Sequence, residues 1–296
     1  MRLLIAGSHG QIALALLEQT LQRDSVRVCA IGRPALDLCT SGSLLSAMTS
    51  SPPDVVINAA AYTAVDQAET NEDDAFQLNC EGARRLAIET WRRQTPIIQL
   101  STDYVFDGSK ASPYEPNDRP EPINAYGRTK LAGEVAVRHA NPHHTIIRTG
   151  WIYSPFGTNF VKTMMRLALE RDEIRVVDDQ LGTPTYAPHL AAALLDVAEK
   201  VHGDDHRESF GVFHVAGTGE ATWADIAREV FRVSKSLGGP SAAVVPMMLA
   251  DNDRPAARPV NARLNCSAAQ QQLGVQLPAW QEGVRACVTR LLRSEK

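Results

Sequence analysis

The sequence predicts an α/β fold, with a Rossmann-type, doubly wound parallel sheet and a smaller C-terminal lobe. Short apolar runs alternate with segments of helical periodicity through the first half, which is the order expected of a parallel sheet. Successive residues of each run are apolar, so helices are needed on both faces of the sheet. A glycine-rich turn directly follows the first run, at the edge where folds of this class bind ligands.

The apolar runs are rich in Val and Ile and are bounded by turn residues, which is typical of buried strands. They are Leu3–Ala6, Val26–Ile31, Val55–Asn58, Ile97–Leu100 and Thr145–Arg148. The segments between them carry apolar residues at helical spacing. We expect helices over Gln11–Arg23, Asp73–Arg93 and Tyr126–His139.

The second half has a looser pattern. Helices are expected at Phe160–Glu170, Pro188–Lys200 and Trp223–Leu237, the last opened by Thr222, and a strand is expected at Val212–Val215. The Pro-containing run Asp251–Arg263 is predicted to be an ordered loop. We therefore predict a nucleotide-fold domain at residues 1–150, completed by returns from the second half, and a second lobe at residues 151–296.

Composition limits the classes of function. The chain has 296 residues, with 30 basic and 34 acidic side chains and a net charge of −4, so neither nucleic acid nor an anionic membrane is an expected partner. Its 5 cysteines are scattered and form no C-x-x-C pair, which argues against a disulfide framework or a zinc site. The run Leu3–Ala6 is too short for a signal peptide or a membrane span. We expect a cytoplasmic protein.

The glycine-rich turn is Gly7-Ser8-His9-Gly10-Gln11-Ile12-Ala13. Glycines at this place let the backbone turn tightly and approach a pyrophosphate, which the N-terminus of the next helix attracts through its free N–H groups. Ala13 would allow the helix to pack closely on the strand. An ordinary glycine turn has the same pattern, but the position after the first strand favours a dinucleotide site.

The end of the second strand indicates which dinucleotide. NAD-binding folds usually place a carboxylate there for the ribose hydroxyls, whereas this strand ends Ile31-Gly32-Arg33. The planar guanidinium of Arg33 could pair with a ribose 2′-phosphate, so NADPH is predicted over NADH, with NADH as the second option. A solvated surface arginine is the alternative. Asp37 and Leu38 are placed beside the adenine, although Asp37 could instead cap the next helix.

A tyrosine and a lysine four residues apart carry the clearest chemistry. Tyr126 and Lys130 share one face of a predicted helix, where the ammonium would favour phenolate and lower the pKa of the tyrosine. Ser101 and Thr102 end the fourth strand, and the Thr102 hydroxyl could bind a substrate carbonyl oxygen. Taken singly, these patterns also fit a helix surface and a strand-end turn or cap.

Together these residues resemble the extended short-chain dehydrogenase/reductases and, more narrowly, the dTDP-4-dehydrorhamnose reductase family. The matching segments cover nearly the whole chain: Gly7–Ala13, Asn58–Asp66, Ser101–Gly108, Tyr126–Glu134, Arg148–Tyr153, Asn159–Met164, Asp179–Thr185 and Arg258–Leu264. The resemblance implies reduction of the C4 ketone of dTDP-4-dehydro-L-rhamnose to dTDP-L-rhamnose. NADPH would supply the hydride and Tyr126 the proton, and the second lobe would mainly bind the substrate.

The resemblance also implies residue roles. Thr102, Tyr126 and Lys130 would form the catalytic triad. Gly10, Gln11 and Ile12 would contact the pyrophosphate, and Asp37 and Leu38 the adenine. Ala61, Tyr62 and Thr63 would lie along the cofactor. The other expected cofactor contacts are Gly7, Arg33, Tyr126 and Lys130. The substrate contacts would be Thr102, Asp103, Tyr126, Trp151 and Arg258, with Arg258 or Arg263 on the diphosphate. Trp151 would lie against the sugar. A core tryptophan and a surface ion pair are the alternatives.

The chain departs from the family pattern at several positions. Tyr62 stands where several relatives have histidine, and Arg128 replaces a more usual lysine. Ala15 occupies a position where some relatives place a metal-binding glutamate, so we expect no metal. A homodimer is expected from the family alone. Two rival functions stay open. One is an epimerase or dehydratase of the same superfamily, which Arg33 and Asp103 disfavour, and the other is a non-catalytic regulatory subunit, which the complete triad disfavours.

Overall fold

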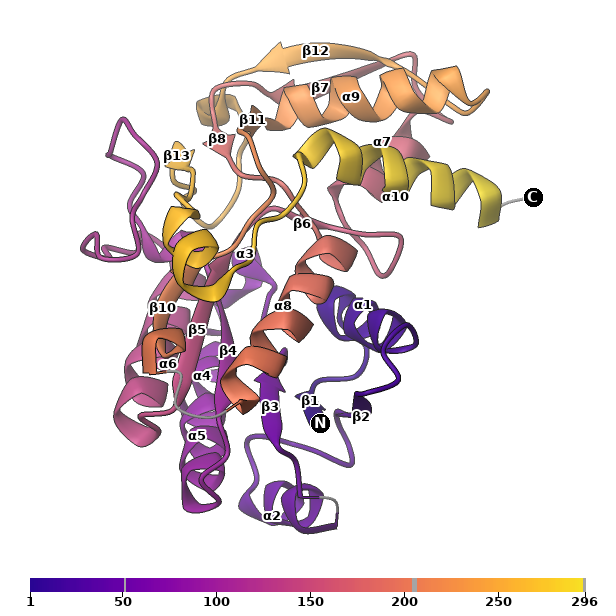
Figure 1. The fold of residues 1–296 in the computed structure, drawn as a ribbon. Coiled ribbons are helices and arrows are strands. Elements are labelled where there is room, and N and C mark those ends of the chain that lie inside the picture. Colours follow the sequence, from indigo (N-terminus) through magenta and orange to yellow (C-terminus); the bar gives the residue numbers. More distant parts are fainter. Residues whose placement is uncertain (51, 204–206, 295–296) are drawn as a thin grey trace.

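The centre of the fold is a six-stranded parallel sheet. In a computed structural model that describes residues 1–50, 52–203 and 207–294, its strand order is β10-β5-β4-β3-β1-β2 (Figure 1). The strands are β1 (Arg2–Ala6), β2 (Arg27–Ile31), β3 (Val55–Asn58), β4 (Ile97–Thr102), β5 (His144–Thr149) and β10 (Gly211–His214). The predicted doubly wound α/β fold class is therefore confirmed.

The strand residues divide between two hydrophobic clusters, because successive side chains of a strand point to opposite faces of the sheet. Leu3 and Ile5 of β1 join Ile57 of β3 in one cluster. Leu4 of β1 joins Val56 of β3 in the other. The apolar residues at successive positions, which led us to expect a sheet buried on both faces, thus serve two separate cores.

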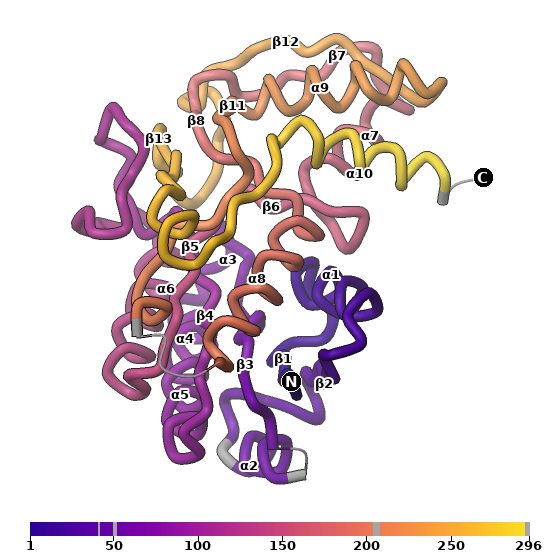
Figure 2. The backbone as a smooth tube through the Cα atoms, viewed as in Figure 1, coloured from indigo at the N-terminus to yellow at the C-terminus, as the bar shows by residue number. Residues whose placement is uncertain are grey.

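Helices cover both faces of this sheet, as Figures 1 and 2 show. One face packs against α1 (Gln11–Thr20) and α8 (Ala187–His202), which also contact each other. The other face packs against α2 (Ser41–Ser50), α5 (Ala83–Arg92) and α6 (Ala125–Ala140). Both α8 and β10 come from the second half of the chain, so the sheet is completed by residues far from the first half in sequence.

The helix predicted over Asp73–Arg93 is not continuous. It consists of α4 (Glu72–Phe76), a π-helical segment at Gln77–Gly82 and α5. The π-helical segment packs against α6 so closely that a Cβ on Gly133 would lie 2.1 Å from the Asn79 carbonyl oxygen. The turn of a π-helix is wider than that of an α-helix, and here it directs the Asn79 side chain toward α6. The hydrophobic periodicity of the sequence predicts a regular α-helix instead.

The second lobe packs α7 (Phe160–Leu167), α9 (Trp223–Ser236) and α10 (Trp280–Ser294) around a shared hydrophobic cluster. Its edge is a parallel pair formed by β7 (Glu173–Val177) and β12 (Ala243–Met247), which lies above α9 in Figure 1. The remaining strands are β6 (Ile152–Tyr153), β8 (Leu181–Gly182), β9 (Thr185–Tyr186), β11 (Ala221–Thr222) and β13 (Asn261–Ala262), and the remaining α-helix is α3 (Val65–Ala68). Short 3₁₀ segments lie at Asp103–Val105, Arg207–Ser209 and Leu249–Asp251, and a further π-helical segment lies at Ala269–Leu273.

The predicted elements of the second half agree with the structure to within a few residues. Thr222 caps α9 as expected, accepting a hydrogen bond from the backbone N–H of Asp225 in a reciprocal capping box. The loop predicted at Asp251–Arg263 contains the short strand β13, which pairs with β8. Among the helices of the described ranges, none is long and apolar enough to cross a membrane.

Candidate active site

The catalytic residues predicted from the sequence lie at the carboxyl-terminal edge of the sheet. Thr102 is the last residue of β4, and Tyr126 and Lys130 lie on the first turns of α6, which contacts β4. Gly7 directly follows β1, the strand next but one to β4. Because all these strands are parallel, their carboxyl ends meet at one edge, and the topology brings the phosphate turn and the triad to the same side.

The phosphate turn has the geometry that a pyrophosphate requires. Gly7 has a φ of +109°, and its N–H donates to the carbonyl oxygen of Ile31 at 2.7 Å. A Cβ on Gly7 would lie 3.2 Å from the backbone nitrogen of Ala60, so a larger residue would push the turn away from β3. Gly10 precedes α1, which no side chain caps, and has open space where its Cβ would be. The N-terminal N–H groups of α1 are thus available to an anion.

Gln11 joins this turn to the second lobe. Its side-chain oxygen accepts hydrogen bonds from Ser154 at 2.7 Å and from the amide of Asn159 at 3.0 Å. The lobe therefore closes onto the first turn of α1. Ile12 packs against the hydrophobic core beside Ala13, which is 1% exposed.

The residues assigned to the adenosine end of the cofactor have different surroundings. Arg33 is exposed just beyond the end of β2. Asp37 accepts a hydrogen bond from the backbone N–H of Cys39 at 2.9 Å, which is a turn rather than the helix cap that we considered. Leu38 is 2% exposed and lies in the hydrophobic core.

A buried asparagine holds the loop that follows β3. The amide of Asn79 accepts from the backbone N–H of Tyr62 at 2.8 Å and donates to its carbonyl oxygen at 3.2 Å. It also donates to the Thr129 hydroxyl on α6 at 3.0 Å. Asn79 thus fixes the stretch Ala61–Thr63 relative to the catalytic helix. Sequence reasoning missed this residue, because the periodicity around it predicts an ordinary helix.

The start of α6 places Tyr126. Asn124 caps the helix by accepting from the backbone N–H of Gly127 at 2.7 Å. A Cβ on Gly127 would lie 2.1 Å from the carbonyl oxygen of Tyr104, so only glycine lets the helix approach the chain leaving β4. The rings of Tyr126 and Tyr104 consequently meet edge to face, with their centroids 6.1 Å apart.

The Lys130 side chain is buried, and its ammonium donates to the carbonyl oxygen of Leu100 at 2.7 Å. Burial lowers the pKa of Lys130 to about 8, and the nearby Glu134 carboxylate opposes this shift. Burial also raises the pKa of the Tyr126 phenol, an effect that its hydrogen bond with Thr102 only partly offsets. The expectation that Lys130 lowers the pKa of Tyr126 is therefore wrong for this structure, because burial dominates both groups.

Beneath Lys130 lies a buried ion pair. Arg148 of β5 donates to both carboxylate oxygens of Glu134, at 2.9 and 2.7 Å, and the two side chains are 4% and 2% exposed. The hydroxyl of Ser101 on β4 also donates to Glu134 at 2.5 Å. The pair ties α6 to β4 and β5 directly behind the catalytic face. Both charged residues stand in the segments that resemble the reductase family, but sequence reasoning assigned no role to them.

Trp151 does not lie with an open ring face. Its backbone has a φ of +51°, and its ring stacks on that of Trp223 with 3.9 Å between centroids and 6° between planes. Gly182 packs against the same ring, where a Cβ would lie 2.2 Å from an aromatic carbon. Trp223 and Gly182 thus both pack against this ring, and the contact of Trp151 with the sugar stays a prediction. The buried indole N–H has no partner among the described residues.

Arg258 and Arg263 are both engaged by other groups. Arg258 donates to the two carboxylate oxygens of Asp66, at 2.5 and 2.8 Å, and its side chain is 10% exposed. Burial lowers the pKa of its guanidinium, and the neighbouring Asp66 and Tyr104 more than offset this effect. Arg263 pairs with Glu220 at 2.7 Å. Arg258 therefore lies near Tyr104, and a substrate diphosphate would have to compete with Asp66 for its guanidinium.

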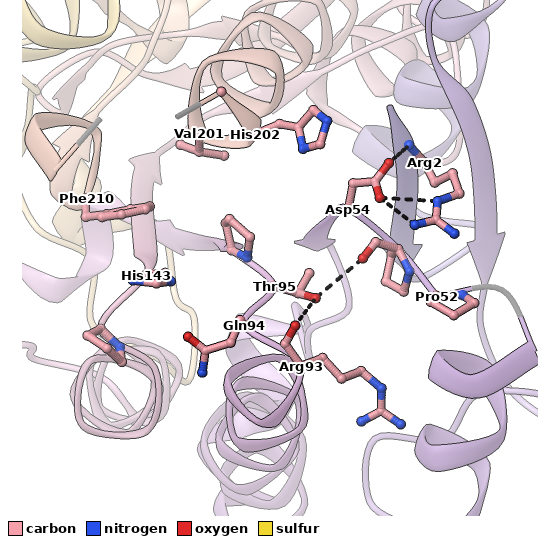
Figure 3. Close-up of a pocket in the computed structure, with 14 residues that line it drawn as sticks. Arg2, Pro52, Asp54, Arg93, Gln94, Thr95, His143, Val201, His202 and Phe210 are labelled. Atoms are coloured by element: carbon pink, nitrogen blue, oxygen red, sulfur yellow. Dashed lines mark hydrogen bonds and ion pairs between the residues drawn. The ribbon is translucent and has the colours of Figure 1, made fainter. Parts of the chain in front are cut away.

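A cavity of about 1140 Å³ lies at the opposite edge of the sheet (Figure 3). It is lined by residues that precede strands, such as Asp54 and His143, and by His202 at the end of α8. Helix C-terminal ends face this edge, and their partial negative charge does not favour a phosphate. Within the described ranges, no cluster of His, Cys, Asp or Glu is suited to hold a metal ion.

Comparison with known proteins agrees with this arrangement. Residues 1–293 match the family described as RmlD substrate binding domain. A Sinorhizobium fredii protein named dTDP-4-dehydrorhamnose reductase is 44% identical over 296 residues, covering 100% of this chain and 99% of that protein. The crystal structure of a dTDP-4-dehydrorhamnose reductase ortholog from Clostridium acetobutylicum has a TM-score of 0.91 at 35% identity, covering 99% of this chain and 100% of that one. The Bacillus anthracis dTDP-4-dehydrorhamnose reductase, solved in complex with NADP, has a TM-score of 0.89 at 33% identity. The match covers 98% of this chain and 99% of that one.

Proposed function

Because the chain belongs to the RmlD substrate binding domain family, we propose that it reduces the C4 ketone of dTDP-4-dehydro-L-rhamnose to dTDP-L-rhamnose with NADPH. Its similarity to proteins named as that reductase extends over the whole chain. The observation that carries the proposal is that Thr102, at the carboxyl end of β4, and Tyr126, on the first turn of α6, lie on two elements that contact each other at the same edge of the sheet. Together the two groups offer a proton and a second hydrogen bond to one carbonyl oxygen.

The residues that would hold NADPH follow the strand ends. The uncapped N-terminus of α1 and the glycines at 7 and 10 suit its pyrophosphate, and exposed Arg33 suits its 2′-phosphate. The stretch Ala61–Thr63, held by Asn79, would lie along the cofactor. When bound, NADPH supplies the hydride that adds to C4.

In this mechanism Tyr126 gives its proton to the C4 oxygen. A raised pKa keeps the phenol protonated at neutral pH, which is the form that a proton donor requires. The Lys130 ammonium uses one N–H on the Leu100 carbonyl and keeps two others for the nicotinamide ribose and for the negative charge that develops on Tyr126. Thr102 holds the C4 oxygen in line while the proton moves.

The substrate would lie between the sheet and the second lobe. In this proposal residues 1–150 with α8 and β10 form the cofactor domain, and residues 151–296 mainly bind the nucleotide sugar. Arg258 would leave Asp66 to bind the diphosphate, because two phosphate groups present more negative charge than one carboxylate. In this proposal Asp103 and the indole N–H of Trp151, both with a buried polar atom that has no partner among the described residues, would contact the substrate.

The test is the loss of NADPH absorbance in the presence of enzymatically generated dTDP-4-dehydrorhamnose. Replacing Tyr126 by phenylalanine should lower kcat by roughly 10²- to 10⁴-fold. Tyr186→Phe is the matched control, because it removes the same hydroxyl from a tyrosine that packs against α10 in the second lobe. If folded wild-type protein consumes no NADPH, the proposed function fails. The epimerase and dehydratase alternatives would instead convert the sugar without net loss of NADPH.

We also propose a homodimer and a cytoplasmic location. Both rest on the sequence predictions given above. Light scattering of the purified protein tests the first, and cell fractionation tests the second.

A further inference from the structure

A buried carboxyl group lies directly behind Thr102. Asp103 is 2% exposed, and its Oδ1 atom accepts a hydrogen bond from the Thr102 hydroxyl at 3.0 Å. Its Oδ2 atom is buried and has no hydrogen-bond partner among the described residues. This atom packs against the backbone of Gly150, where a Cβ would lie 2.3 Å away. A carboxyl group with one hydrogen bond and this degree of burial is poorly placed to carry a charge.

The groups that face Asp103 do not offset this burial. They are Tyr104 on its own segment, Tyr126 from α6 and the backbone beside Trp151 after β5. The cations Arg258 and Arg254 act on Tyr104, and neither is among the groups that shift the pKa of Asp103. Arg258 is bound to Asp66. Burial accordingly raises the pKa of Asp103 to about 7, which the Thr102 hydrogen bond only partly opposes. The carboxyl group therefore keeps its proton below about pH 7, well above the pH at which an exposed aspartate loses it.

Thr102 connects this proton to the catalytic tyrosine. A hydroxyl has one proton to donate and two lone pairs. The backbone N–H of Tyr104 donates to Thr102 at 3.2 Å and occupies one lone pair. The O–H donates to the Asp103 carboxyl group, which leaves the remaining lone pair for the Tyr126 phenol on the first turn of α6. Tyr126, Thr102 and Asp103 thus form one chain of O–H groups from the reacting edge into the protein interior.

Resting on the proposed function, we propose that Asp103 is the proton reservoir that restores the catalytic phenol through Thr102. After Tyr126 gives its proton to the C4 oxygen, the phenolate takes the Thr102 proton, and Thr102 takes the Asp103 carboxyl proton. One O–H bond breaks and one forms at each step, and the negative charge ends on Asp103. Solvent protonates Asp103 again when the product leaves.

Repulsion between the two acids gives this chain its direction. A charged Asp103 raises the pKa of both Tyr126 and Tyr104, so carboxylate and phenolate oppose each other when both are present. A protonated Asp103 is therefore favoured when Tyr126 loses its proton. During the transfer the single O–H of Thr102 serves the substrate oxygen, and afterwards it turns to the phenolate.

The decisive variant is Asp103→Asn, which keeps the size of the side chain and an oxygen to accept from Thr102 but has no proton to pass on. We expect kcat to fall about a hundredfold, the lower end of what a positioned acid contributes, with KM for the sugar nearly unchanged. In the wild type, kcat should decline as pH rises through about 7, because the reservoir empties. In the variant this decline should be absent. Asp107→Asn is the control. The Asp107 carboxyl group takes no part in the series Tyr126, Thr102 and Asp103, and it accepts a hydrogen bond from the Tyr114 hydroxyl.

Two outcomes would overturn the proposal. One is wild-type kcat with an unchanged pH profile in Asp103→Asn. The other is a rise in KM alone, which would make Asp103 a substrate contact only. Should the variant not fold, the proton inventory of wild-type turnover in mixed H₂O and D₂O decides, because a chain of transfers requires a curved plot and a linear plot excludes it.

Infrared titration separates this proposal from the reaction itself. A protonated carboxyl band that disappears near pH 7 in wild-type protein and is missing from Asp103→Asn would support the reservoir without any substrate. Absence of that band from folded wild-type protein would refute it. Failure of the wild type to oxidise NADPH would instead refute the proposed function.

Discussion

Replacing Glu134 by glutamine should destabilise the protein strongly. The Glu134 side chain is 2% exposed, and Arg148 grips both of its oxygens at 2.9 and 2.7 Å. Glutamine would remove the charge and turn an amide N–H₂ toward the guanidinium, which leaves a buried cation without its partner. Breaking a buried ion pair in this way costs about 3–5 kcal/mol. The unfolding entropy of a chain of 296 residues is about 0.6 kcal/mol/K, so Tm should fall by about 5–8 °C.

The matched control is Glu72→Gln. Arg128, which like Glu134 lies on α6, donates to both carboxylate oxygens of Glu72, each at 2.9 Å. Unlike the Glu134 pair, both side chains of this pair are 45% exposed. Exposed pairs contribute about 0–1 kcal/mol, so Tm should change by less than about 2 °C. Thermal melts followed by circular dichroism compare the two variants. Equal changes in Tm for the two variants would contradict the prediction, because they would show that burial does not increase the contribution of the Glu134–Arg148 pair to stability.

Three further changes test other parts of the site. Arg33→Ala should lower kcat/KM for NADPH and leave that for NADH nearly unchanged, and an unaltered ratio of the two constants would contradict the 2′-phosphate assignment. Burial lowers the pKa of Lys130 from 10.5 to about 8, so the unfolded chain binds more protons between these values. Urea midpoints of the wild type should therefore rise relative to those of Lys130→Met as pH increases through this window, and parallel curves would contradict the shift. Gly127→Ala should remove most activity and reduce stability, because its Cβ would lie 2.1 Å from the Tyr104 carbonyl oxygen. Gly42→Ala, with nothing within 4 Å, should leave NADPH oxidation and the urea midpoint unchanged.

The sheet could be predicted from the sequence because its signals are local. A strand buried on both faces needs apolar residues at successive positions, and β3 is apolar at Val55, Val56 and Ile57. The predicted range for β3 agrees with the structure, and the other predicted strands of the sheet differ by only one or two residues at their ends. The phosphate turn is equally local, because Gly7 and Gly10 lie within four residues of each other.

The second lobe could not be predicted in the same way. Its parallel pair joins Glu173–Val177 with Ala243–Met247, and each strand alone is a short run without turn residues that mark its partner. Pairing strands so distant in sequence depends on α9, which packs against both of them and against α7 and α10 of the lobe. The π-helical segment around Asn79 has a similar origin, because it is favoured by contacts with Tyr62 and α6 rather than by its own residues.

The titration of the catalytic pair shows the same limit in chemical form. The spacing of Tyr126 and Lys130 correctly places them on one helix, and it predicts that the ammonium lowers the pKa of the phenol. Burial reverses the net effect: it raises the pKa of Tyr126 and lowers that of Lys130. The residues responsible, among them Leu100 and Tyr104, come from β4 and the segment after it. Because the Tyr126 phenol is protonated before the reaction, its phenolate has to be stabilised only while the proton leaves. The Lys130 ammonium and the Thr102 hydroxyl can stabilise this anion at that moment, without lowering the resting pKa of Tyr126.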